Sequence, residues 1–242
     1  MGPDASCART LGAGPELRSR AVGDVRTVLE EECRRVSALL LALSEEEFRR
    51  PTRCEPWDAK ELTAHLYRSL MRIPTSLDDD APAVADTDSV TYWRSYDVPT
   101  DAPVIAAHAR ATAAEYETGA ELAAAFDELW RTALDRARSA DPGRLVHVWW
   151  GPNLRLDDFL TTRVLEVVVH GLDMTQALRR APIASDEGIR MVKETLDGLL
   201  GHPAPMHWSD IELIEKGTGR LPLSDADVEE LGSVADAFPL LG

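Results

Sequence analysis

Two side chains that could carry chemistry lie four residues apart in an otherwise apolar stretch of the chain. Glu166 and His170 belong to the segment 162–173, which is rich in valine and leucine. Positions i and i+4 share a face on an α-helix and also on a β-strand, so the two side chains project together in either structure. Burying a carboxylate is costly unless it is paired or bound to a metal. Glu166 is therefore expected to have a neutralising partner or to be a metal ligand.

The surrounding pattern favours a helix. Apolar residues continue from Leu154 to Leu178, which is too long for a typical strand. Asp157 and Asp158 lie near the start of this stretch, and arginines follow its end, as the helix dipole favours. We therefore expect Glu166 and His170 to project from one face of a long helix.

A third candidate is His65, on a helix predicted over 59–73. Asp58 with Glu61 three residues later is a capping pattern, and His65 shares a face with apolar residues of this helix. If this helix faces the later one, two imidazoles and one carboxylate converge and leave open coordination positions, as catalytic zinc requires. The same set suits non-haem iron. A single histidine on an apolar face is more often a core residue, so spacing alone leaves both interpretations open.

In most of the remaining chain, apolar residues recur at the spacing of an α-helix. Residues 74–103 are polar and contain four prolines, which predicts a long connection whose aromatic residues Tyr92, Trp93 and Tyr96 either border a pocket or simply anchor the loop. Residues 146–152 are expected to form a short extended segment or a turn, and 211–214 a short strand or a helical turn. Further helices are expected over 16–43, 45–49, 104–139 and 185–200, with a short one beginning at Ser224 or Asp225.

This pattern predicts a mainly α fold, in which a four-helix bundle with one long crossover is followed by a short C-terminal α(+β) appendage. Residues 1–14, rich in Gly, Pro and Ala, are expected to be a disordered leader. The metal-binding bundle domain would cover 15–180, and a C-terminal extension of helices and a short strand, 181–242, would pack on it.

Composition narrows the partners and the compartment. The 242 residues carry a formal net charge of −16, which argues against nucleic acid and anionic membranes as partners. The sequence has no run of ~20 apolar residues, so no membrane span is predicted, and the first residues do not resemble a secretory signal. Cys7, Cys33 and Cys54 form no CxxC motif and suit a reducing cytoplasm. None has a clear catalytic setting; Cys54 is expected to be a small packing residue. Both a monomer and a homodimer remain open.

Three segments carry a family resemblance. Residues 52–66, TRCEPWDAKELTAHL, resemble the T-x-C-x-x-W-x-x-x-x-L-x-x-H-L signature of the DinB-like metal-binding superfamily, and within it the mycothiol-dependent maleylpyruvate isomerase family. Residues 163–173 resemble that family's second signature, E-x-x-x-H-G-x-D. The tail segments 217–223 and 238–241 are similar to the C-terminal part of many members.

The resemblance implies a DinB-like four-helix bundle in which His65, Glu166 and His170 hold a metal, usually zinc. It also implies that mycothiol supplies a thiol from outside the chain. A thiolate is the attacking form, and a bound cation favours it. If the thiol adds to an electrophile and leaves again, the result is cis–trans isomerisation; if it stays, the result is S-conjugation. The electrophile itself is left open.

Three further residues are candidates. Asp173, three residues after His170, could orient that ligand or pair near the helix end. Arg220, in a Gly-rich turn, could bind a substrate carboxylate through its planar fork. Arg163 is expected to balance a carboxylate rather than pair with an anionic substrate. Two other functions compete with thiol transfer: a hydrolase whose metal activates water, and a non-catalytic small-molecule-binding bundle with a closed metal site.

Overall fold

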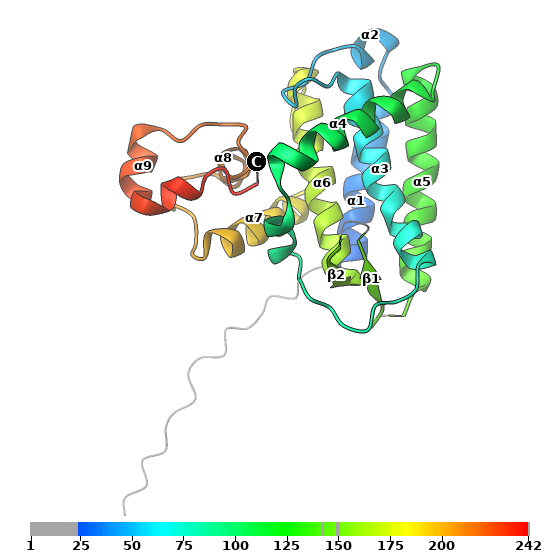
Figure 1. Ribbon diagram of the computed structural model, residues 1–242. Coiled ribbons are helices and arrows are strands. Elements are labelled where there is room, and N and C mark those ends of the chain that lie inside the picture. The colour runs from blue at the N-terminus through cyan, green and yellow to red at the C-terminus, as the bar shows by residue number, and fades with distance from the viewer. Residues whose placement is uncertain (1–23, 142, 149–150, 242) are drawn as a thin grey trace, which may run out of the picture.

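The computed structural model describes residues 24–141, 143–148 and 151–241, and it is mainly helical, as the sequence predicts (Figure 1). Four long helices pack side by side in the described part of the chain. Helices α3 and α1 each contact α5 and α6, so the bundle core lies among all four. These helices are α1 (Val25–Leu40), α3 (Ala59–Asp78), α5 (Gly119–Ser139) and α6 (Leu156–Ala177).

The two helices that carry the candidate ligands begin as predicted. The Asp58 side chain accepts a hydrogen bond from the Glu61 backbone N–H, and the Glu61 side chain accepts one from the Asp58 backbone N–H, which closes the capping box of α3. Two aspartates occupy the first turn of α6. Buried residues occur on all sides of α6 because α1, α3 and α7 surround it. The functional side chains of α6 are therefore fixed by a rigid, central helix.

The connection predicted over 74–103 is shorter and more structured than expected. Helix α3 continues through Pro74 to Asp78, a 3-10 helix η1 occupies Thr91–Ser95, and α4 (Val98–Ala114) has already begun before residue 103. The packing of α3 on α5 and α4 outweighs the one hydrogen bond that Pro74 cannot donate. Proline content alone therefore overstated the length of irregular chain.

The prediction of a single helix over 104–139 is wrong. The chain turns between α4 and α5, and Thr118 starts the second helix by accepting from the Glu121 backbone in a complete capping box. This Thr–x–x–Glu pattern is present in the sequence but lies within a stretch of continuous helix-forming residues. Two separate helices result, and α4 crosses over α3 instead of extending α5 (Figure 1).

Helix α1 begins at Val25, with Asp24 as its cap; the expected start at 16 and the expected leader 1–14 lie outside the described residues. Residues 211–214 are helical, within α8. The remaining elements are α2 (Glu45–Phe48), the antiparallel pair β1 (Leu145–His147) and β2 (Asn153–Arg155), α7 (Asp186–Leu200), α8 (Asp210–Gly217), α9 (Asp225–Leu231) and η2 (Gly232–Ala237).

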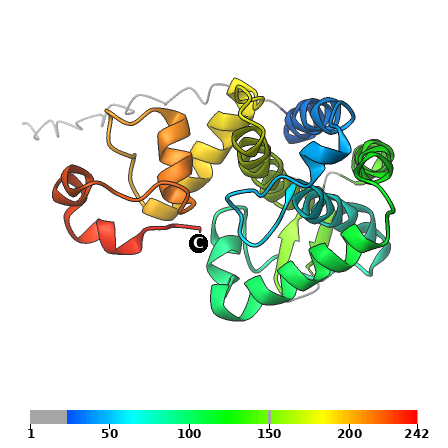
Figure 2. The same ribbon diagram turned by 90° about the horizontal axis from the view of Figure 1, so that it is seen from above.

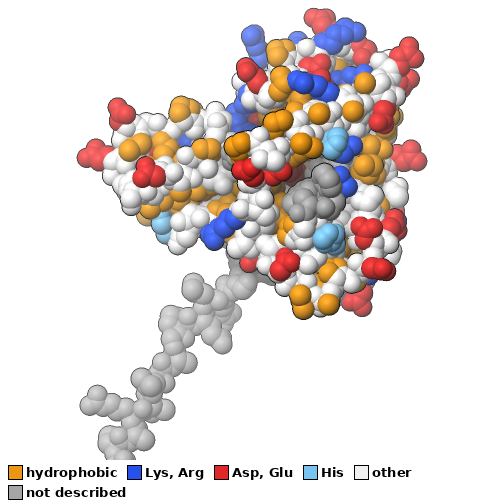
Figure 3. All heavy atoms as spheres, in the orientation of Figure 1, with side chains coloured by type: hydrophobic (Ala, Val, Ile, Leu, Met, Phe, Trp, Pro, Cys, Tyr) orange, Lys and Arg blue, Asp and Glu red, His pale blue; other side chains and the backbone are white. Residues whose placement is uncertain are grey.

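The C-terminal helices lie to one side of the bundle (Figure 2). Helix α7 contacts α6 and α1, and α8 packs on α7. Acidic side chains are spread over the face shown in Figure 3, in line with the net charge of −16. No helix within the described ranges is both long enough and apolar enough to cross a membrane.

Candidate metal centre

His65, Glu166 and His170 come together between α3 and α6. The Nε2 atom of His65 lies 2.9 Å from Glu166 Oε2, and the Nε2 atom of His170 lies 3.3 Å from the same oxygen. One donor atom from each of the three side chains lies within 4.8 Å of the others. All three side chains are only 12–15% exposed.

The donor set fits a divalent metal. Bonds of about 2.0–2.1 Å to nitrogen and oxygen in a tetrahedral site place neighbouring donors about 3.3 Å apart. The two nitrogen–oxygen separations, 2.9 and 3.3 Å, are close to that value. Without a metal the same contacts are hydrogen bonds that centre on Glu166. Two imidazoles and one carboxylate would leave at least one coordination position for a further ligand.

Asp173 holds His170 from the side opposite to Glu166. Its Oδ2 atom lies 2.9 Å from His170 Nδ1, and the aspartate is fully buried. A carboxylate that accepts from Nδ1 fixes the tautomer that leaves Nε2 able to bind a metal. The contact therefore favours the orienting role for Asp173 over a helix-end pairing role.

The contacts among these side chains shift their pKa values. Burial by itself would raise the pKa of Glu166, but hydrogen bonds from His170 and His65 lower it well below its ordinary value. Burial lowers the pKa of His65. Burial also acts to lower the pKa of His170, but hydrogen bonds to Asp173, Cys54 and Glu166 together raise it well above the usual histidine value. A metal that binds His170 Nε2 would therefore have to displace a proton that these contacts stabilise.

Two arginines surround the buried Asp173. Arg53 Nε donates to Asp173 Oδ1 at 2.6 Å, and its Nη1 donates to Glu215 at 2.7 Å. Arg220 Nε and Nη2 donate to the two oxygens of Asp173 at 3.1 and 2.9 Å, and its Nη1 donates to the Thr218 carbonyl at 2.7 Å. Arg220 does reach the pocket, but its fork faces Asp173.

Cys54 is not the plain packing residue expected from the sequence. It is partly exposed, and its Sγ lies 2.9 Å from Asp173 Oδ2, 3.7 Å from His170 Nδ1 and 3.5 Å from Arg220 Nη2. Thr52 holds the turn that presents it, because its backbone N–H and hydroxyl both donate to the Trp57 carbonyl. The position of Cys54 inside the 52–66 signature was the available signal.

Two residues beside this cluster, Trp57 and Arg163, have different roles. Trp57 stacks on the His65 ring with centroids 4.9 Å apart, which limits rotation of that imidazole. Arg163 is only 3% exposed and donates to Ser69 Oγ at 2.9 Å and Tyr92 OH at 3.3 Å. The hydrogen bonds of Arg163 therefore go to hydroxyl and carbonyl oxygens, and its charge reaches Glu166 through space.

A pocket of about 800 Å³ surrounds the candidate ligands. The aromatic residues of the 74–103 connection line it, so they border a pocket rather than only anchor a loop. Its lining comes from the turn 53–57, η1, the first half of α4, α3, α6 and the tail: Arg53, Cys54, Glu55, Trp57, His65, Tyr92, Trp93, Ser95, Tyr96, Val98, Ala102, Ile105, Ala106, Leu165, Glu166, Val169, His170, Thr218, Gly219, Arg220, Pro239, Leu240 and Leu241.

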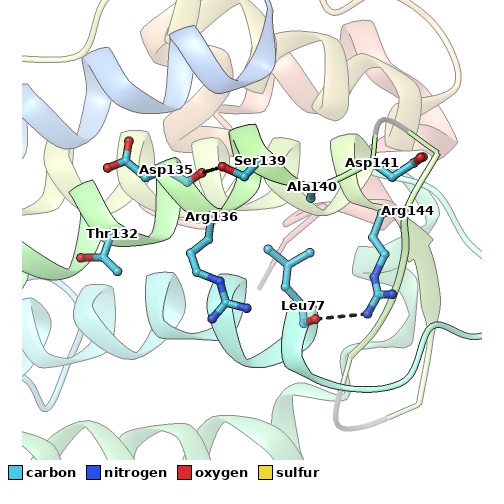
Figure 4. A pocket seen from close by; sticks show the side chains of 8 residues that line it. All are labelled: Leu77, Thr132, Asp135, Arg136, Ser139, Ala140, Asp141 and Arg144. Atoms are coloured by element: carbon cyan, nitrogen blue, oxygen red, sulfur yellow. Dashed lines mark hydrogen bonds between the residues drawn. The ribbon is translucent and has the colours of Figure 1, made fainter.

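A second hollow, between the ends of α3 and α5, carries no comparable chemistry (Figure 4). Its arginines are already engaged: Arg136 pairs with Asp78 at 2.6 Å, and Arg144 donates to the Leu77 carbonyl at 3.2 Å. Its α3 residue, Leu77, lies at the C-terminal end of that helix, whereas His65 lies in the first half. The pocket around His65 is therefore the candidate active site.

The chain matches a known family model. The family model described as "Mycothiol maleylpyruvate isomerase N-terminal domain" matches residues 29–175. That range contains His65, Glu166, His170 and Asp173 but ends before Arg220. Searches of curated proteins and of solved structures each return no match.

Proposed function

The chain belongs to the mycothiol maleylpyruvate isomerase N-terminal domain family, a DinB-like family, and on that premise we propose that it is a metal-dependent enzyme that uses mycothiol. Mycothiol would add to an electrophilic small molecule, either remaining as an S-conjugate or leaving after cis–trans isomerisation. The observation that carries this proposal is the convergence of two imidazoles and one carboxylate on the floor of a large pocket.

In this proposal His65, Glu166 and His170 hold the metal, for which zinc is the first candidate. A bound zinc ion lowers the pKa of a thiol or water that binds it and so supplies a nucleophile at neutral pH. Asp173 accepts from His170 Nδ1 and keeps Nε2 directed at the site. Arg53 and Arg220 in turn hold Asp173, so they are positioning residues.

The segment beyond the family match contributes to the same pocket. Arg220, Pro239, Leu240 and Leu241 line it from the C-terminal side. The Leu241 backbone N–H donates to the Gly217 carbonyl at 2.9 Å, which fixes the tail against the end of α8. These contacts support the proposal that the extension 181–242 completes the catalytic unit. Cys33 and Cys54 are both free thiols, consistent with the cytoplasm as the proposed compartment.

Thiol-dependent turnover tests the proposal. Zinc-loaded protein is mixed with mycothiol and an electrophile panel that includes maleylpyruvate, and the conjugate or isomer is followed chromatographically. Glu166→Gln is expected to abolish turnover because it removes the charged ligand. His147→Ala is the control, since His147 lies on β1 and hydrogen-bonds Asn153 away from the pocket. Turnover that needs no thiol would indicate a hydrolase instead.

A further inference from the structure

The lining of the candidate pocket comes from two groups of elements that differ in chemistry. One wall, from the turn 53–57 and the tail, carries the charged residues Arg53, Glu55 and Arg220 beside the apolar tail residues Pro239, Leu240 and Leu241; we call it the polar wall. The other wall comes from η1 and the first half of α4. The end of the chain lies beside the first turns of α4 in both Figure 1 and Figure 2, so the tail and α4 meet at this pocket.

The arginines of the polar wall already have anionic partners. Arg53 is paired with Asp173 and Glu215, at 2.6 and 2.7 Å. Arg220 is paired with Asp173 at 2.9 Å, and each of its three nitrogens donates a hydrogen bond. A small dicarboxylate would have to replace these contacts to gain a cationic partner. The arginines of the polar wall therefore serve to hold Asp173, which orients His170, and are not available to bind a substrate carboxylate.

The α4 wall carries no charge among its described lining residues. Val98, Ala102, Ile105 and Ala106 form its helical part, and Tyr92, Trp93 and Tyr96 extend it. A substrate carboxylate against this wall would lose its hydration without a cationic partner, since the Nε1 atom of Trp93, which has no hydrogen-bond partner, offers only a neutral donor. An aromatic or branched alkyl group would instead bury apolar surface there.

We propose that the electrophile is a neutral molecule whose aromatic or branched-alkyl body lies against the α4 wall, with its reactive carbon toward the metal centre. This specificity rests on the proposed thiol transfer. In a substitution the thiol sulfur forms a bond to the reactive carbon, the leaving group departs with the bonding electron pair, and the thiol proton passes to solvent. The hydroxyl-rich remainder of mycothiol would occupy the polar side.

A matched pair of electrophiles tests the charge preference. 2-Chloro-1,3-dinitrobenzene is neutral, 4-chloro-3,5-dinitrobenzoate is the same molecule with one added carboxylate, and both release chloride when a thiol attacks. After subtraction of the uncatalysed rate, kcat/KM with zinc-loaded protein and mycothiol is expected to be at least about tenfold higher for the neutral compound. An equal value, or a preference for the benzoate, would overturn the proposal while leaving thiol transfer intact.

Two neighbouring residues of α4 give matched variants. Ile105 lines the pocket, whereas Val104 is 45% exposed and does not line it. Ile105→Glu is expected to lower kcat/KM for the neutral compound by about 10–200-fold, and Val104→Glu is expected to leave it unchanged. Ala102→Glu, also in the lining, replaces Ile105→Glu if circular dichroism shows that the latter is unfolded. Equal effects of the pocket-facing and outward-facing variants would contradict the proposal.

Binding without chemistry separates this proposal from the function on which it rests. Equilibrium dialysis of zinc-loaded protein with 1,3-dinitrobenzene and with 3,5-dinitrobenzoate measures the same charge difference on unreactive molecules. Preferential binding of dinitrobenzene that Ile105→Glu weakens, with no turnover of any electrophile, would support the apolar wall and refute thiol transfer. Absence of that preference would refute the apolar wall, whether or not turnover occurs.

Discussion

Replacing Asp173 by asparagine tests how the metal centre is held. The variant keeps the size of the side chain but removes the negative charge that His170, Arg53 and Arg220 share. Loss of a carboxylate partner of a metal-ligating histidine typically costs 10–100-fold in metal affinity, or about 1.4–2.7 kcal/mol. Breaking one side of a buried ion pair costs about 3–5 kcal/mol of stability. We expect a loss of stability near 3 kcal/mol, the lower end of this range, because Arg53 still pairs with Glu215 and Arg220 still donates to the Thr218 carbonyl.

The pH dependence has a defined sign. Asp173 helps to raise the pKa of His170, so in the wild type a proton competes with the metal at neutral pH. In Asp173→Asn the pKa of His170 is lower, so a proton competes less with zinc than it does in the wild type. At pH 6.5 proton competition weakens zinc binding by the wild type more than by the variant, which narrows the difference between them. The variant should therefore bind zinc more weakly than the wild type by a larger factor at pH 8.5 than at pH 6.5. Competition with a chromogenic chelator at both pH values measures this difference.

The matched control is Glu215→Gln, which removes the other partner of Arg53 without touching His170. The Glu215 side chain is 27% exposed, so its loss should cost less than about 1 kcal/mol of stability. Zinc affinity of this control should equal that of the wild type. If Asp173→Asn binds zinc as tightly as the wild type at pH 8.5, or if Glu215→Gln weakens zinc equally, the orienting role of Asp173 is refuted.

Three further variants test other parts of the structure. Burial raises the pKa of Glu32, so the wild type loses stability as pH rises through that pKa; Glu32→Gln should unfold at a higher temperature than wild type at pH 7 and show no gain at pH 4. Thr118→Ala removes the cap of α5 and should cost about 1 kcal/mol in urea denaturation, whereas the exposed Thr132→Ala on the same helix should change stability by less than about 0.5 kcal/mol. Cys54→Ser should leave the zinc content of the purified protein unchanged, because Cys54 contacts the Nδ1 side of His170; loss of zinc would place the sulfur in the site.

The parts of the fold that the sequence predicted are those encoded by local signals. The starts of α3 and α2 follow from capping boxes at Asp58 and Ser44, and α6 from a long apolar pattern. The break before α5 was encoded equally locally, at Thr118, but the helix-forming residues on both sides hid it. Proline content led to the opposite error, a loop predicted where the chain is helical, because tertiary packing keeps Pro74 within α3.

The candidate site was predictable only where a motif marked it. His65, Glu166 and His170 stood in recognisable segments, and the structure brings their donor atoms together. The contacts of Cys54 and Arg53 with Asp173 span 119 and 120 residues of chain, so no periodicity could indicate them. Likewise the apolar wall of α4 depends on how that helix crosses the bundle, a tertiary property.

X-ray absorption at the zinc edge, before and after addition of mycothiol, tests the central claim most directly. We expect about one zinc per chain, bound only by nitrogen and oxygen at about 2.0–2.1 Å, with a sulfur ligand appearing at about 2.3 Å when mycothiol is added. Glu166→Gln, lacking the shared charged ligand, should lose most of the zinc. Wild-type protein that binds no zinc, or a spectrum that mycothiol leaves unchanged, would contradict the account.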